Sequence, residues 1–95
     1  MLVLPQELTQ AEATACLALL LQGLRAETGP QVEVDAAALK RFDSAALAVL
    51  LEFRRNCITA GKRFSVRDLP ARLGDLAMLY GVGELLGTEL VRDLL

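Results

Sequence analysis

The sequence predicts a small α/β domain with a mostly parallel sheet of three to four strands and three to four helices. Short β-like runs at 1–5, 31–35 and 63–67 are interpreted as strands, the latter two because apolar and polar residues alternate, and a longer run with helical spacing follows each of them. Successive strands joined through helices lie parallel in one sheet. The chain of 95 residues supports one core, so we expect a single domain over 1–95.

The first strand is the run "MLVLP", which Pro5 closes. The helix after it begins near Thr9, because Thr9 and Glu12 have the spacing of a capping box. Apolar residues then recur at helical spacing until Gly29 and Pro30 end the segment. We therefore expect the first strand and helix to fill the N-terminal third of the chain.

The middle of the chain has a strand, a connection and the second helix. Residues 31–35, "QVEVD", alternate valine with polar residues, which indicates a strand with one buried face and a sheet whose other face is only partly covered. The small-residue stretch "AAALKR" reads as a link. The helix is expected over 44–60, and Gly61 ends it.

The last third has a strand at 63–67 and a helix from about 69 to 80. Proline is tolerated in the first turn of that helix, and Gly81 is a natural end. Residues 82–95 read as a short helix and a loosely held tail. The apolar stripe expected for the third helix consists of Leu69, Leu73, Leu76, Ala77 and Tyr80.

The composition argues against several classes of function. A formal net charge of −2 and the absence of a basic patch argue against nucleic-acid binding. The longest apolar runs are seven residues, where a membrane-spanning helix needs roughly 20, so we expect no direct membrane insertion. The N-terminus lacks the features of a secretory signal, and Cys16 and Cys57 read as buried free thiols. These features predict a cytoplasmic protein.

The motifs of catalysis and cofactor binding are also missing. The chain has no histidine, and its two cysteines match no metal-ligand spacing. The segment "GVGELLG" follows a helix and lacks the lysine of a phosphate-binding loop, and "FDSAA" is not a nucleophile elbow. We expect no catalytic residues, no metal and no cofactor, and hence no enzyme.

Asp43 and Ser44 stand at the start of the second helix and admit two interpretations. Asp43 is a good N-cap residue, and Phe42 and Leu47 have the spacing of a hydrophobic staple. On this interpretation Ser44 is only a polar residue in the first turn. The cap explains Asp43, but it leaves Ser44 and its small neighbours unexplained.

A helical projection gives the second interpretation. The core face should consist of Ala46, Leu47, Leu50, Leu51, Phe53, Cys57 and Ile58. Ser44 and Ala48 project to the opposite flank, with Ala45 and Val49 beside them. Small and apolar residues there, instead of Lys or Glu, favour a contact surface for a protein partner made of Asp43, Ser44, Ala45, Ala48 and Val49. A tolerated run of small residues remains the alternative.

These residues resemble the STAS family, the sulphate-transporter and anti-sigma-factor-antagonist domains. A valine-rich strand ends in Asp35, and "FDSAALAVLLEFRRNCITAGKRFSV" places Asp43, Ser44, Leu47 and Gly61 as in the family pattern, in a match from about Leu8 to the C-terminus. The resemblance implies a small STAS-like α/β fold. It also implies a non-catalytic interaction domain whose contact surface is centred on the Asp43–Ser44 helix start.

Within the family, the stretch over 43–86 with its "LAMLYGV" segment is most similar to the MlaB-type branch. That resemblance implies a cytoplasmic subunit that supports the MlaF-like ATPase of a phospholipid ABC transporter maintaining outer-membrane lipid asymmetry. The protein would then be peripheral to the inner membrane through the ATPase and the membrane permease. The alternative is an anti-sigma-factor antagonist switched by phosphorylation of Ser44, and a third reading is a self-assembling scaffold.

The chain departs from the family pattern in two places. Family members usually begin with an extra antiparallel strand, of which only "LVLPQEL" remains here, so we expect an exposed sheet edge at residues 2–4 that permits self-association. The glycine of the family motif is replaced by Ala46. Since Ala46 projects inward, a methyl group is acceptable there, but it puts close approach of a partner's backbone in question.

Overall fold

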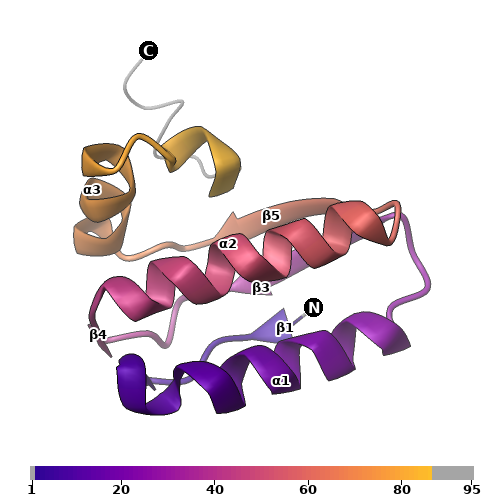
Figure 1. The fold of residues 1–95 in the computed structure, drawn as a ribbon, viewed down its shortest axis with the longest axis horizontal. Helices are drawn as coiled ribbons and strands as arrows, with labels where there is room; N and C mark the ends of the chain where they lie inside the picture. The colour runs from indigo at the N-terminus through magenta and orange to yellow at the C-terminus, as the bar shows by residue number, and fades with distance from the viewer. Residues whose placement is uncertain (1, 87–95) are drawn as a thin grey trace.

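The structure is a computed structural model that describes residues 2–86 (Figure 1). Its helices and strands alternate along the chain in the predicted order, with two additional short strands. The elements are β1 (Leu2–Val3), β2 (Glu7–Leu8), α1 (Gln10–Ala26), β3 (Gln31–Asp35), β4 (Arg41–Phe42), α2 (Ser44–Thr59), β5 (Arg63–Arg67), α3 (Ala71–Leu79) and the 3-10 helix η1 (Gly83–Leu86).

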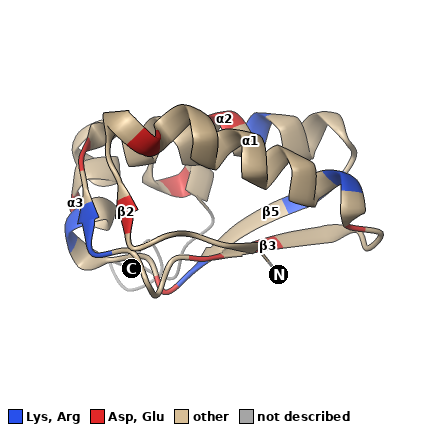
Figure 2. Cartoon of the chain, turned by 90° about the horizontal axis from the view of Figure 1, so that it is seen from below, with Lys and Arg blue, Asp and Glu red and all other residues tan. Residues whose placement is uncertain are grey.

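The main sheet has three parallel strands in the order β1–β3–β5. Val34 of the central strand lies opposite Leu2 on one side and Val66 on the other. Helices α1 and α2 lie on the same face of β3 and β5, so the domain has two layers (Figure 2). The other face carries polar residues, and Arg67 pairs there with Glu33 at 3.7 Å. The predicted α/β class and the partly covered sheet face are thus confirmed.

A second parallel pair, β2 with β4, lies apart from the main sheet. Glu7 is opposite Arg41, and Leu8 is opposite Phe42. The carbonyl oxygen of Gln6 accepts hydrogen bonds from the N–H groups of Lys40 and Arg41, at 2.8 and 3.0 Å. The sequence predicted only a connection here, because strands of two residues are too short to show alternation. The pair brings the segments that precede α1 and α2 side by side.

The helix boundaries follow the expected signals. At α1, the Glu12 carboxylate accepts hydrogen bonds from the N–H and the hydroxyl of Thr9, both at 2.8 Å. Gly61 and Gly81 follow α2 and α3 with φ of 77° and 73°, a conformation that costs glycine little. The predicted ends of these helices are therefore confirmed. Of the expected tail, residues 87–95 lie outside the described part of the chain.

The core lies between the sheet and the helices. Val32 and Val34 of β3 are buried, and the ring of Phe53 on α2 meets that of Phe64 on β5 edge to face, with centroids 6.0 Å apart. Gly23 of α1 lets Leu2 lie against the helix, since a Cβ atom at this position would come within 2.4 Å of the leucine side chain. The edge strand β1 therefore packs closely on α1.

Two residues expected in the core are exposed instead. Tyr80 is the C-cap residue of α3, and its side chain is exposed. The buried side chains of this helix include those of Leu73 and Ala77. Ile58 in the last turn of α2 is also exposed. The helical projection placed Ile58 inside. In the structure the buried stripe of α2 is rotated away from Ile58, toward Val49 and Phe53.

Candidate functional site

Asp43 joins the starts of the two long helices. As the N-cap of α2, it accepts a hydrogen bond at Oδ1 from the N–H of Ala45, at 2.8 Å. Its Oδ2 accepts a second from the N–H of Gln10, the first residue of α1, at 3.2 Å. One carboxylate therefore serves two helix N-termini, each of which presents unpaired N–H groups and a partial positive charge. The predicted cap is confirmed, and the bond to α1 adds a tertiary role.

Ser44 is the first residue of α2 and is exposed. Within residues 2–86 its hydroxyl has no hydrogen-bond partner. Ala48 lies one turn further along and is also exposed, and Ala45 is half-buried. The accessible hydroxyl of Ser44 and the methyl groups of Ala45 and Ala48 thus lie in the first turns of α2. We call Asp43, Ser44, Ala45 and Ala48 the Ser44 surface.

The expected exposure of Val49 is wrong. Its side chain is only 4% exposed and belongs to the core cluster. Helix α2 contacts the sheet and also α1, α3 and η1, so its buried arc extends from Leu47 round to Val49. A projection of one helix shows the direction of each side chain, but it does not show how wide an arc the neighbouring elements cover. Val49 therefore belongs to the core and not to the contact surface.

A pocket of about 540 Å³ lies beside Ser44, between the start of α2 and α3. Its α3 side includes Leu76 and Leu79, and the Leu79 side chain is 78% exposed. The guanidinium of Arg72 lies over the ring of Phe42, 5.4 Å from its centre. No residue of α3 was predicted from the sequence to belong to the site. The signal that could have found it is the second leucine in "LAMLYG", which falls off the buried stripe of α3.

The Asp43 carboxylate is occupied by backbone N–H groups, so it offers Ser44 no general base. Among residues 2–86, no group of three His, Cys, Asp or Glu residues is placed to hold a metal ion. Cys16 and Cys57 are buried, and burial raises the pKa of both thiols. In this same part of the chain no helix has the length and apolar character needed to cross a membrane.

The comparison with protein families assigns the class: the family model described as "Mlab, STAS domain" matches residues 1–91, and the chain belongs to the STAS domain family. No curated protein matches the chain. STAS domains are generally non-catalytic regulatory domains that mediate protein–protein interactions, and this chain is a STAS-type protein.

Proposed function

We propose that this protein is the STAS subunit of an ABC-type phospholipid transporter and that it binds and supports the ATPase subunit. The observation that carries the proposal is the match of the Mlab STAS model to nearly the whole chain, residues 1–91. The protein contacts the membrane permease only through the ATPase. Its location is then cytoplasmic, at the inner membrane, and its role is the upkeep of outer-membrane lipid asymmetry.

The Ser44 surface is the contact site in this proposal. Ser44 and Ala48 are exposed, small and adjacent, which lets a partner's helix or loop approach the backbone of α2 closely. The neighbouring pocket offers the exposed side chain of Leu79 as an apolar anchor. Because the Asp43 carboxylate fixes both helix starts, the surface is already formed before a partner binds, which lowers the entropic cost of association.

One observation favours a second candidate, an anti-sigma-factor antagonist that a partner kinase switches. The Ser44 hydroxyl is accessible and stands at a helix N-terminus, where N–H groups accommodate a phosphate. Phosphorylation would add about −1.5 to −2 charges next to the Asp43 carboxylate. That charge would release a partner bound on the Ser44 surface.

The test is an affinity pulldown from detergent-solubilised membranes of the native host. The baits are wild type, Ser44→Glu, Ala48→Glu and Thr59→Glu, the last being a control with the same charge on an exposed residue at the far end of α2. We expect wild type and Thr59→Glu to recover an ABC ATPase with its permease, and the other two variants to lose both.

Two outcomes would contradict the proposal in different ways. Recovery of a soluble kinase-like protein in place of the ATPase would support the phosphorylation switch. Recovery of the ATPase by all four baits would place the contact elsewhere and leave the transporter assignment standing. Circular dichroism of each bait shows beforehand that the substitutions leave the fold intact.

A further inference from the structure

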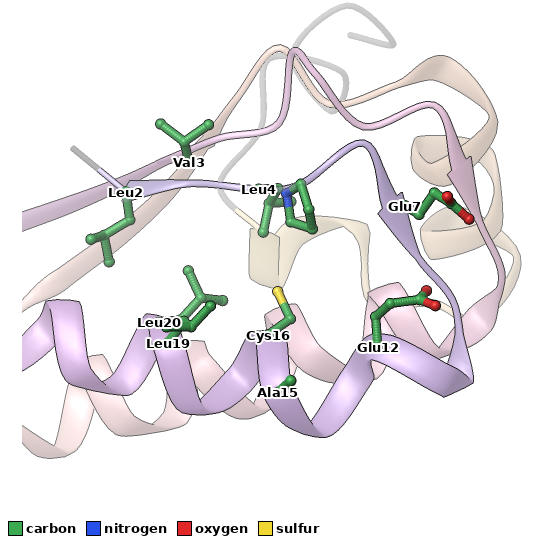
Figure 3. A pocket seen from close by; sticks show the side chains of 10 residues that line it. Leu2, Val3, Leu4, Glu7, Glu12, Ala15, Cys16, Leu19 and Leu20 are labelled. Atoms are coloured by element: carbon green, nitrogen blue, oxygen red, sulfur yellow. The ribbon is translucent and has the colours of Figure 1, made fainter.

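A groove runs along the free edge of the main sheet, between β1 and α1 (Figure 3). Its volume is about 520 Å³, within the range of binding sites. We call it the β1–α1 groove. It is lined by Leu2, Val3, Leu4, Pro5, Glu7, Glu12, Ala15, Cys16, Leu19 and Leu20. Eight of these ten residues are apolar, and the Leu19 side chain is 67% exposed. An exposed apolar groove of this kind indicates a binding surface.

The edge of β1 offers backbone hydrogen bonds to an extended peptide. The N–H of Leu4 donates to the carbonyl oxygen of Asp35 at 2.9 Å, toward the inside of the sheet. Because successive residues of a strand turn their polar groups to opposite sides, the N–H and C=O of Val3 face the free edge. Pro5 has no N–H, so the edge ends there. A peptide that adds to β1 can therefore pair with Val3 while its side chains enter the groove.

The two carboxylates lie together at one end of the groove, beyond Leu4 (Figure 3). The pKa of the Glu12 carboxyl is lowered, chiefly by the hydrogen bond from the Thr9 N–H, so this group is ionised at neutral pH. Glu7 pairs with Arg41 at 3.7 Å, but both side chains are exposed, and such pairs exchange readily. No lysine or arginine lines the groove, but Arg41 beside it pairs with Glu7 and helps to lower the pKa of Glu12. The electrostatic complement of this end is a cation.

A second copy of this chain fits only some of these features. Any extended segment added to β1, from a second copy or from another protein, pairs with Val3 alone among residues 2–4, so backbone hydrogen bonds do not distinguish the two occupants. Residues 2–8, the segment that would enter the partner's groove, contain no lysine or arginine. That segment would therefore bring no lysine or arginine to the carboxylates of Glu7 and Glu12. The self-association expected at residues 2–4 stays a prediction, and this segment does not supply the cation that the carboxylate end of the groove complements.

We propose that the β1–α1 groove binds an extended segment of a protein partner, with apolar side chains in the groove followed by a lysine or arginine at Glu7 and Glu12. The groove is built from β1, α1 and Glu7 of β2, whereas the Ser44 surface lies at the start of α2, beside the pocket that reaches α3. The proposal does not depend on the transporter assignment, and it gives the domain a second binding site.

The test selects ligands for the full chain from short random peptides displayed on phage, with counter-selection on Leu19→Glu. Ala18→Glu is the matched control, since Ala18 is exposed on the same helix but does not line the groove. We expect the selected peptides to combine apolar residues with a lysine or arginine. A synthetic copy should bind Leu19→Glu and Glu7→Lys at least about tenfold more weakly than wild type or Ala18→Glu. Its affinity should fall as salt is raised.

Several results would overturn the proposal. Selected peptides without a basic residue would show that the carboxylates are not part of the site, and equal binding to Leu19→Glu would show that the groove is not used. A dimer in sedimentation that Leu19→Glu dissociates would make the occupant a second copy. Phospholipid that copurifies with wild type and not with Leu19→Glu would make it an acyl chain. If Leu19→Glu fails to fold, Glu7→Lys on the exposed β2 gives the same comparison.

Discussion

Replacing Asp43 tests whether one carboxylate holds the starts of α1 and α2 together. Loss of an N-cap to alanine typically costs about 1 kcal/mol. The second hydrogen bond, to the Gln10 N–H at 3.2 Å, is exposed, so we assign it about 1 kcal/mol as well. We therefore expect Asp43→Ala to lower the free energy of unfolding by about 2 kcal/mol. For a domain of this size that loss lowers the melting temperature by roughly 8 to 16 °C.

Asp43→Asn separates the contributions of these two hydrogen bonds to the free energy of unfolding. Asparagine caps a helix as well as aspartate does, but it has only one acceptor oxygen, so it keeps the bond to the Ala45 N–H and loses the one to Gln10. Urea unfolding followed by circular dichroism should rank the proteins as wild type, Asn, then Ala, with steps of about 1 kcal/mol. Asp75→Ala, an exposed aspartate on α3, is the control. An Asn variant as stable as wild type would refute the bridge to α1.

Three further predictions concern burial and protonation. Val49→Glu should lower the free energy of unfolding by about 3 kcal/mol or more, because the charge is buried unpaired, whereas Ala48→Glu should change it by less than about 0.5 kcal/mol in the same urea assay. Cys16 and Cys57 should react with a thiol reagent more slowly at pH 8 than free cysteine does, since burial raises the pKa of both thiols, and rapidly in urea. The pKa of the Glu12 carboxyl is lower in the folded protein than its ordinary value of 4.5, so the ionised carboxylate stabilises the fold above that pH. This contribution should be lost as the pH falls through the folded pKa, and Glu12→Gln should flatten the acid side of a stability–pH curve.

The sequence predicts the parts of this fold that local patterns control. Strands β3 and β5 have the predicted bounds, because five alternating residues suffice to show their period. The Asp43 cap is equally local, since cap and helix are adjacent in the chain. The bond from Asp43 to Gln10 spans 33 positions and exists only because β2 pairs with β4. Neither short strand has a recognisable pattern, so this contact could not be predicted.

The sequence likewise predicted only the part of the candidate site that depends on helical geometry, and not the part that depends on neighbouring elements. The outward direction of Ser44 and Ala48 follows from helical geometry alone, and the structure agrees with it. Val49 lies at the margin of the buried arc, where neighbouring elements decide its exposure. The contribution of Leu79 depends on how α3 is placed against the start of α2, which the sequence of either helix does not specify.

The position of Asp43 also affects how substitutions of Ser44 are interpreted. A negative charge at the first residue of α2 is favoured by the helix dipole but repelled by the adjacent carboxylate, which holds the N–H groups of Ala45 and Gln10. Ser44→Glu can therefore act on a partner and on the joint between α1 and α2 at once. Ala48 is a full turn away from that joint. Loss of binding by Ala48→Glu therefore indicates that the partner contacts the Ser44 surface. Loss of binding by Ser44→Glu alone indicates instead that the substitution disturbs the hydrogen bonds of Asp43 at the starts of α1 and α2.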